Sequence, residues 1–373
     1  MKTKIIALYL PQFHCIPEND KFWGKGFTDW VTVKKATPLY EGHNQPRIPM
    51  DNNYYDLSQE KNVEWQARLA HTHGIYGFGV YHYWFNNEQN LLTRPAEILR
   101  DSNNCSTKYF LIWDNTNWKR SWGNVAGNDW APVADKLVDR KKSPTILVPY
   151  ILGSERDWEN HYDYVRTHFL SSNYEKRLNK PVFGIHVYGK SVLKMCEYWN
   201  VLAKKDGFDG ICFIFHYQPF QGLPKAAMRY TYEPHWIGWE KKTFLKKVVN
   251  KLKREMHIET HKDIMFYDYD DIWRNLLAYA SKQDKPNLIH GAFVGYDDSP
   301  RRGRNGAKIV TGGSPEKFKK YLSELYDISG RQNKDYIFLT AWNEWGEGAY
   351  LEPDTIYDMS YLQAIKEIVG YQV

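Results

Sequence analysis

Cysteine is scarce in this chain: the 373 residues include four, at positions 15, 105, 196 and 212. No two of them have CxxC spacing, and their sequence contexts differ, so the sequence indicates neither a zinc site nor a disulfide framework. The thirteen histidines form no HExxH motif and no other clustered ligand spacing. We therefore expect no metal, no cofactor and a reducing, cytoplasmic location.

Long apolar runs are also missing, since no stretch approaches the ~20 residues that cross a bilayer. The first residues, MKTKIIALYLPQFH, contain a short apolar run, but no small-residue cleavage site follows it. This segment is better interpreted as a buried strand than as a signal peptide. The net charge of +6 is scattered and forms no basic stripe. We expect no membrane span and no nucleic-acid partner, and the sequence does not indicate an oligomeric state.

Aromatic residues, in contrast, are abundant: 15 Trp, 28 Tyr and 17 Phe make up 16% of the chain. The stretch YHYWF at residues 81–85 mixes rings with hydrogen-bonding groups. Sugar-binding clefts have this character, because rings stack on pyranose faces while hydroxyls need polar partners, but core packing uses many aromatic residues too. The composition is therefore compatible with carbohydrate binding without establishing it.

Apolar, β-rich runs alternate with amphipathic segments along the chain. The candidate strands are residues 5–10, 77–83, 109–113, 145–150, 182–187, 210–215, 265–267, 288–294 and 336–341. The candidate helices are residues 60–73, 158–169, 192–205, 241–256, 272–281, 315–329 and 361–369. Runs such as IIALYL and YIFLTAW are continuous, as expected for parallel strands covered on both faces. Roughly eight or nine such units predict an α/β fold, and the lack of GxGxxG after the first strand favours a closed (β/α)8 TIM barrel over a doubly wound sheet.

Three long loops, at residues 11–56, 114–143 and 218–239, are rich in Trp, Tyr, His, Asn and Asp. Loops of this length and composition are usually functional. No linker, repeat or low-complexity segment divides the sequence, so we expect one domain over residues 1–373. In a barrel, the long βα loops would gather at the carboxyl ends of the strands, where active sites lie.

Two glutamates stand three residues apart in AWNEWGEGAY, residues 341–350, directly after the last candidate strand. Two carboxyl groups held close in an apolar pocket do not both ionise cheaply, so burial would raise the pKa of at least one and leave one acid and one base. Cleavage of a glycosidic bond uses such a pair. On spacing alone, a structural alternative stays open, in which Glu344 pairs with an arginine and Glu347 caps a turn. The nearby residues Glu352 and Asp354 are interpreted as structural.

Nearly the whole chain resembles a known family. The resemblance rests on four stretches: LYLPQFHCIPENDKFWGKGFTDW (8–30), GVYHYWF (79–85), GYDDSPRRG (295–303) and AWNEWGEGAYLEPD (341–354). The sequence resembles the WbsX-like family, which is similar to glycoside hydrolase family 99, the endo-α-mannosidase-like enzymes. The resemblance implies a (β/α)8 barrel that acts on glycans, often polysaccharides of bacterial surfaces. Some members of the family have been labelled glycosyltransferases from their gene context.

The same resemblance implies roles for the two glutamates, because the matching N-E-W-x-E stretch supplies both catalytic residues in family 99. By position, Glu344 would deprotonate a sugar 2-hydroxyl, and Glu347 would act as general acid and base at the glycosidic oxygen. The intermediate would be a 1,2-anhydro sugar, with retention of configuration and no metal. One departure is Thr116, in WDNTNWKRSW, where WbsX-like relatives typically carry a glutamate.

Other residues fall where the loops would meet the mouth of the barrel. As substrate contacts we expect Gln12, His14, Tyr81, His82, Asn115, Asn117, Trp118, Asp297, Trp342 and Trp345. Each has a competing explanation: a histidine is commonly a core residue bonded to a backbone carbonyl, and Asp297 and Asp298 with Arg301 would equally order their own loop. Trp342 and Trp345 would also lower the dielectric around the acids. The turn at residues 23–30 is interpreted as architectural.

The leading hypothesis is a retaining glycoside hydrolase that cuts an α-linked polysaccharide or oligosaccharide, such as a bacterial surface glycan or a mannan-like polymer. A glycosyltransferase of surface polysaccharide (O-antigen or capsule) biosynthesis is the alternative; residues 268–270, DYD, fit a metal-binding DxD pattern, without any other phosphate-binding feature. A carbohydrate-binding module is a third hypothesis, but binding alone needs rings and amides more than paired acids.

Overall fold

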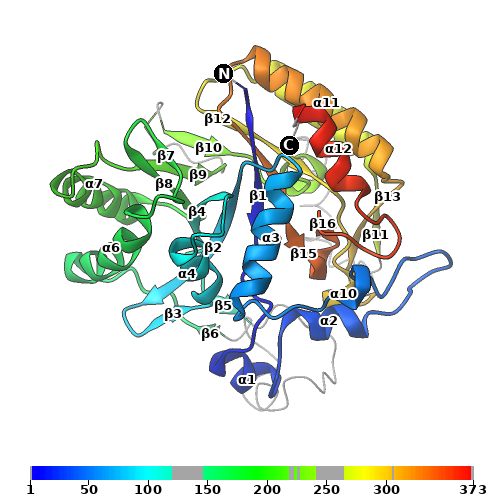
Figure 1. Cartoon of the computed structure of the whole chain (residues 1–373), viewed down its shortest axis with the longest axis horizontal. Coiled ribbons are helices and arrows are strands. Elements are labelled where there is room, and N and C mark those ends of the chain that lie inside the picture. Colours follow the sequence, from blue (N-terminus) through cyan, green and yellow to red (C-terminus); the bar gives the residue numbers. More distant parts are fainter. Residues whose placement is uncertain are drawn as a thin grey trace, which may run out of the picture.

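Eight parallel strands close into a barrel, each paired with the next along the chain and the last with the first (Figure 1). The computed structural model describes residues 2–119, 146–217, 222–224, 227–240, 264–304 and 306–370. The barrel strands are β1 (Lys4–Tyr9), β2 (Gly77–Asn86), β4 (Lys108–Trp113), β8 (Lys180–Ile185), β9 (Cys212–His216), β10 (Met228–Tyr230), β12 (Leu288–Phe293) and β14 (Tyr336–Thr340). The predicted (β/α)8 barrel is confirmed.

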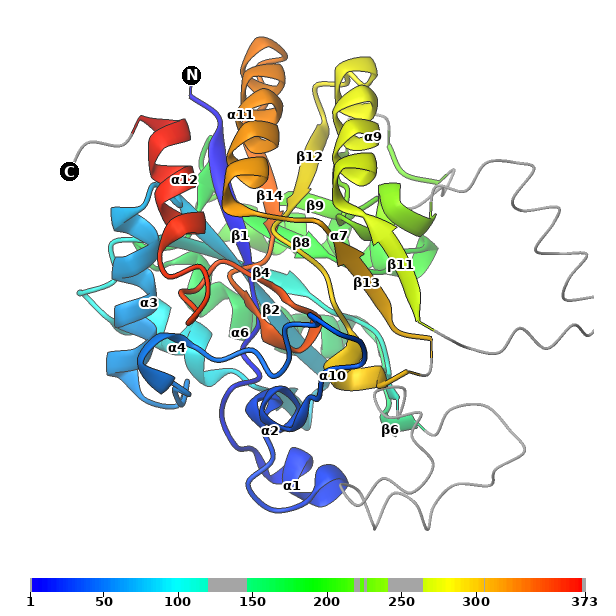
Figure 2. The same ribbon diagram turned by 90° about the vertical axis from the view of Figure 1, so that its right-hand side faces the viewer.

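Helices cover the outside of the barrel in both views (Figure 1, Figure 2). They include α3 (Glu60–Thr72), α4 (Arg94–Asp101), α6 (Glu155–Phe169), α7 (Lys190–Lys205), α9 (Tyr269–Lys282), α11 (Pro315–Arg331) and α12 (Ser360–Val369). Side-chain caps define where some of them begin: Ser314 accepts the Lys317 N–H, and Asp268 accepts the Asp271 N–H. The short helix α4 was not predicted, and the helix predicted at residues 241–256 lies outside the described residues. Among the residues that the structure describes, no helix has the length and apolar character to cross a membrane.

Two of the nine candidate strands lie outside the barrel. Residues 146–148 form β6 (Ile146–Val148), which pairs antiparallel with β5 (Trp118–Lys119), and residues 265–268 form β11 (Met265–Asp268), which pairs with β13 (Lys308–Thr311). Barrel strand β10 lies instead in the segment predicted as loop, residues 218–239. Its three residues carry little hydrophobic signal of their own, and hydrogen bonds from β9 and β12 on either side define it.

Short elements gather at the end of the barrel toward which β1 points, the lower end in Figure 2. They are α1 (Pro17–Trp23), α2 (Asp29–Lys35), α10 (Ser299–Arg302), the hairpin of β15 (Asn343–Glu344) and β16 (Ala349–Tyr350), and the 3-10 turn η3 (Trp345–Glu347). Helix α2 and helix α10 both contact η3. Segments far apart in the sequence therefore meet at the carboxyl ends of the strands, as barrel geometry requires of an active-site face.

Candidate functional site

The hairpin β15–β16 presents both predicted catalytic glutamates. Glu344 ends β15 and Glu347 ends the turn η3 between the two strands. The side chain of Asn343 fixes the hairpin to the end of β1, because its amide bonds the N–H of Leu10 at 2.8 Å and the carbonyl of Leu10 at 2.9 Å. Asn343, directly before the first glutamate, therefore anchors the pair to the barrel.

The glycines around the second glutamate have a steric reason. A Cβ added at Gly346 would lie 2.7 Å from Nε of Arg301, so only glycine lets that guanidinium lie against the turn. Gly348 has a φ of +59°, and a Cβ there would lie 2.8 Å from Cζ of Arg47. The W-G-E-G spacing thus makes room for two arginines beside the acids.

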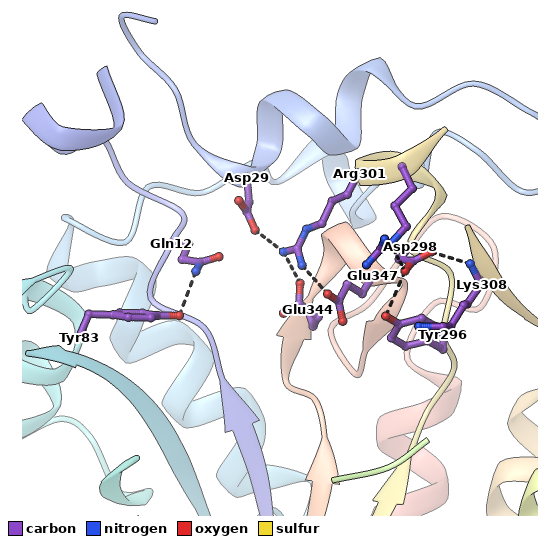
Figure 3. Close-up of polar contacts among 10 residues, drawn as sticks. Gln12, Asp29, Tyr83, Tyr296, Asp298, Arg301, Lys308, Glu344 and Glu347 are labelled. Carbon is purple, nitrogen blue, oxygen red and sulfur yellow. Dashed lines mark hydrogen bonds and ion pairs between the residues drawn. The ribbon is translucent and has the colours of Figure 1, made fainter. Parts of the chain in front are cut away.

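Arg301 joins the two glutamates to a third carboxylate (Figure 3). Its Nη1 donates to Oε1 of Glu347 at 2.6 Å, and its Nη2 donates to Oε1 of Glu344 at 2.7 Å and to Oδ2 of Asp29 at 2.9 Å. We call these four residues the carboxylate cluster. The guanidinium fork holds both glutamates on one planar group, which fixes their relative orientation.

Burial and charge act strongly on two carboxyl groups of the carboxylate cluster, those of Glu344 and Asp29. The side chain of Glu344 is 5% exposed and that of Glu347 is 19% exposed. Burial raises the pKa of Glu344 well above the usual glutamate range, against the pull of Arg301 and with the help of the Glu347 and Asp29 charges. Burial likewise raises the pKa of Asp29. The two glutamates therefore differ in burial, and Glu344 is the more enclosed of the two.

The loop that carries Arg301 is held by two aspartates. The carboxylate of Asp298 accepts hydrogen bonds from the backbone N–H of Lys308 at 2.7 Å and from Nε of Arg302 at 2.6 Å. The hydroxyl of Tyr296 donates a third hydrogen bond to it at 3.3 Å (Figure 3). The neighbouring residue Asp297 is 1% exposed and accepts Nε2 of Gln45 at 2.7 Å. These contacts fix helix α10, and with it the guanidinium between the glutamates.

A cleft of about 580 Å³ opens beside the carboxylate cluster. Its lining comes from the loop after β1, the end of β2, and the segments after β4 and β8: Gln12, Asn19, Trp23, Phe27, Asp29, Tyr83, Asp114, Asn115, Thr116, Asn117, Trp118, Leu147, Tyr150 and Val187. Asp29 belongs both to this lining and to the carboxylate cluster. The two glutamates stand next to the cleft rather than in its wall. The guanidinium of Arg301 connects them to Asp29, which does line the cleft.

Four predicted substrate contacts line this cleft: Gln12, Asn115, Asn117 and Trp118. Gln12 donates to the hydroxyl of Tyr83 at 2.9 Å (Figure 3). Asn115 bonds the backbone of Val187 through both ends of its amide, at 2.5 and 2.7 Å, and Asn117 accepts the Tyr150 N–H at 2.6 Å. The asparagines therefore shape the loops of the cleft as well as facing it.

His82 requires a correction, because it does not reach the cleft. Side chains alternate along β2, and Tyr81 stacks with Tyr83 on one face while His82 lies on the other. There the Nε2 of His82 lies 2.8 Å from Nε2 of His161 on helix α6, and burial lowers the pKa of His82 to about 3. His82 is a core residue between the barrel and its helices, as in the competing explanation, but its partner is a second histidine and not a backbone carbonyl.

Five further candidates lie outside the cleft lining. His14 is 5% exposed, and Trp342 and Trp345 are fully buried. Asp297 bonds the loop after β1 instead of facing the cleft: in addition to Gln45, it lies 2.9 Å from Nε2 of His43. Tyr81 is half-buried on the same face of β2 as Tyr83. Strand ends identified the right region, but not which side chains turn inward.

Sequence reasoning underestimated Asp29, Arg301 and the aromatic turn before Asp29. Trp23 and Phe27 line the cleft, although residues 23–30 were interpreted as architectural. Arg301 and Asp29 are 272 positions apart, and no spacing rule connects them. The signal that could have found them was their presence in the two family-like stretches, residues 8–30 and 295–303. The structural alternative for Glu344, an arginine partner, is also present in the structure.

A closed (β/α)8 barrel of this kind is the fold of known carbohydrate-active enzymes. The structure of the GH99 endo-alpha-mannosidase from Bacteroides thetaiotaomicron is 16% identical, with 98% of this chain and 96% of that chain covered and a TM-score of 0.54. A structure described as a glycoside hydrolase-like protein is 13% identical, with 100% and 95% covered and a TM-score of 0.57. At these identities the likeness establishes the fold.

The family follows from the sequence match. The family model described as Glycosyltransferase WbsX matches residues 5–365, and the chain belongs to this family. A curated relative, Uncharacterized protein WxcX of Xanthomonas campestris pv. campestris (strain B100), is 28% identical over 378 residues, which cover 98% of this chain and 50% of the relative. The chain thus spans about half the length of the curated relatives it matches.

Proposed function

We propose that this protein is a retaining glycoside hydrolase that cleaves an α-linked polysaccharide or oligosaccharide. One observation carries the proposal: Glu344 and Glu347 are held by the same guanidinium at the mouth of the barrel, beside a cleft lined by aromatic rings and amides. Glycosidic bonds are cleaved by carboxyl pairs of this kind. The likeness in fold to a GH99 endo-alpha-mannosidase supports the same reaction class and an α-linked substrate.

In the first step, Glu344 takes the proton of the sugar 2-hydroxyl, and the freed O2 attacks the anomeric carbon. Glu347 donates its proton to the glycosidic oxygen as the bond from that oxygen to the anomeric carbon breaks, so the leaving sugar departs as an alcohol. The product on the enzyme is a 1,2-anhydro sugar. Glu344 suits the role of base because a raised pKa makes its carboxylate a stronger base toward the 2-hydroxyl.

In the second step, Glu347 takes a proton from water, and the water oxygen opens the anhydro ring at the anomeric carbon. Glu344 returns its proton to O2. Two inversions at the anomeric carbon give net retention, and each glutamate ends in its starting state. Arg301 engages Oε1 of each glutamate, so we assign Oε2 of each to the substrate.

Glycosyl transfer is the alternative, and the printed description of the family names it. Two observations favour hydrolysis. Among the described residues, those that line the cleft include no lysine or arginine to neutralise a nucleotide diphosphate. The DxD-like residues are engaged elsewhere: Asp268 caps helix α9, and Asp270 accepts from Lys317 at 2.6 Å and from Tyr321 at 2.7 Å.

Incubation with a panel of α-linked oligosaccharides and bacterial polysaccharides, without any nucleotide sugar, tests the proposal. We expect release of a reducing sugar whose first-formed anomer keeps the α-configuration, observed by proton NMR. Product that forms only when a nucleotide sugar is added would establish transfer instead. An inverted first-formed anomer would exclude the anhydro-sugar route.

A further inference from the structure

A third glutamate of the same hairpin region, Glu352, lies buried just after β16 and is 4% exposed. Its carboxylate accepts three hydrogen bonds from three different parts of the chain. Oε2 accepts from the Tyr55 hydroxyl at 2.6 Å and from Nε1 of Trp345 at 2.7 Å, and Oε1 accepts from Nε2 of Gln66 at 2.6 Å. Among the described residues, no lysine or arginine pairs with Glu352, so hydrogen bonds hold it there.

The bond to Trp345 connects Glu352 to the two glutamates. Trp345 is the first of the two residues between them and the first residue of the turn η3, so the position of its indole constrains the backbone of that turn. The indole stacks on Tyr350 with ring centroids 3.7 Å apart and an interplanar angle of 13°. The indole also packs against the ring of Trp30, with ring centroids 5.4 Å apart. Trp30 directly follows Asp29 of the carboxylate cluster.

The two other donors anchor this arrangement to the barrel. The amide of Gln66, on helix α3, is oriented by the hydroxyl of Tyr9 on β1, which donates to its Oε1 at 2.6 Å. Because the Gln66 oxygen is engaged in this way, its Nε2 must be the group that faces Glu352. The ring of Tyr55 packs against that of Trp30 at 5.0 Å. Glu352 therefore ties η3 to β1, α3 and the loop before α3.

We propose that Glu352 is a positioning residue, which sets the geometry of Glu344 and Glu347 through its hydrogen bond to the Trp345 indole. The proposal rests on the function proposed above for the two glutamates. Glu352 is not among the described residues that line the cleft, and its carboxylate contacts no member of the carboxylate cluster in the structure as described. It acts on the reaction through Trp345, without touching the substrate.

The substitution Glu352→Gln isolates this role, because it keeps the shape of the side chain and replaces one acceptor oxygen by an NH2 donor. In the structure all three partners donate to Glu352, so the new NH2 group meets at least one donor whichever way the glutamine amide is turned. A matched control stands at the opposite end of the barrel. Glu175 is also buried and accepts three bonds, from Lys4 at 3.0 Å, Tyr336 at 2.7 Å and Tyr76 at 2.7 Å. Glu175→Gln makes the same chemical change far from η3.

Steady-state kinetics of the two variants, with the fraction folded measured by circular dichroism, test the proposal. We expect Glu352→Gln to lower kcat at least tenfold and to leave KM within about twofold, since the cleft is unchanged. Glu175→Gln is expected to keep both kcat and KM within about twofold of the wild type, even if its melting temperature falls as much as that of Glu352→Gln. Equal losses in the two variants, or a loss confined to KM for Glu352→Gln, would overturn the proposal.

Crystal structures of the two variants give a readout that needs no substrate. In Glu352→Gln we expect the Trp345 indole to shift and the bonds of Glu344 and Glu347 to Arg301 to lengthen or exchange, while Glu175→Gln leaves them unchanged. An unmoved indole and unchanged Arg301 bonds in Glu352→Gln would refute the positioning role. If the wild-type protein cleaves no α-glycoside, the function proposed above fails by itself, and the crystal structures still decide whether Glu352 sets the geometry of the two glutamates.

Discussion

The two ends of the barrel handle buried carboxylates in opposite ways. At the amino end, the single carboxylate of Glu175 receives an ammonium and two tyrosine hydroxyls, from Lys4, Tyr76 and Tyr336. At the carboxyl end, the single guanidinium of Arg301 is shared by three carboxylates, those of Asp29, Glu344 and Glu347. One arrangement gives a carboxylate several donors, and the other gives a donor group several carboxylates.

The first arrangement is typical of a contact that stabilises the fold, and the second is typical of a site that performs chemistry. The Glu175 arrangement ties the first residues of β1 and β14 together and satisfies its carboxylate, as a structural contact should. The carboxylate cluster keeps like charges close together in a buried place, which costs free energy and shifts pKa values upward. Such costly groups are concentrated at active sites, and in barrels they lie at the carboxyl ends of the strands.

The comparison is tested most severely by Arg301→Ala, which leaves three buried carboxylates without their shared partner. We expect a loss of about 3–5 kcal/mol in the free energy of unfolding at pH 8, measured by urea denaturation. The loss should shrink as the pH falls toward 5, because the carboxyl groups then take up protons instead of staying charged.

The control for Arg301→Ala is Lys4→Met at the amino end. The Lys4 side chain is 33% exposed, and its partner Glu175 keeps two tyrosine donors, so we expect a loss of about 1 kcal/mol or less. Losses of equal size at the two ends would remove the distinction drawn between them.

A second expectation concerns the pH dependence of stability. Burial raises the pKa of Glu352 from 4.5 to about 7, although Tyr55, Trp345 and Gln66 pull it downward. A carboxyl group with a raised folded-state pKa contributes stability that is fully present below pH 4.5 and is lost as the pH rises through about 7. The expected contribution is on the order of 3 kcal/mol. Denaturation curves between pH 4 and pH 8 should show a smaller decline for Glu352→Gln than for the wild type, and parallel declines would contradict the assignment.

The smallest of these effects concerns the cleft. Trp118 lies across from Tyr83, with ring centroids 5.4 Å apart, and lines the cleft with it. We expect Trp118→Ala to raise KM roughly tenfold through the loss of stacking area, on the order of 1–2 kcal/mol, with kcat nearly unchanged. Trp158→Ala on the outer helix α6 is the control, because it removes a tryptophan that packs on Tyr198 outside the cleft. A KM that rises equally in both variants would argue against the cleft as the binding site.

Most of the barrel could be predicted from the sequence, because buried parallel strands are continuous apolar runs. Seven of the barrel strands begin or end within a few residues of the predicted ranges, as β1 and β14 do. Strand β10 could not be found, since its three residues are set by their neighbours on either side. The segment at 145–150 has a strand pattern, but pattern alone does not say whether a strand joins the barrel or pairs outside it.

The candidate site was predictable in part, for a related reason. Glu344 and Glu347 follow directly from a strand end, and their neighbourhood is local in sequence. Their contacts with Arg301 and Asp29 are not local, and a guanidinium partner leaves no periodic signal. The direction of His82 depends on the alternation phase of β2, which the run of aromatic residues at 81–85 conceals.

The central claim is that the two glutamates move different protons, and it is tested by measuring kcat/KM of Glu344→Gln and Glu347→Gln on two α-glycosides, one with a sugar and one with a nitrophenyl leaving group. We expect Glu347→Gln to lose at least ~100-fold on the sugar leaving group and less than ~10-fold on the nitrophenyl group, which departs without protonation. Glu344→Gln should lose at least ~100-fold on both, because O2 stays protonated in either case. Small, equal losses for the two variants on both substrates would contradict the account.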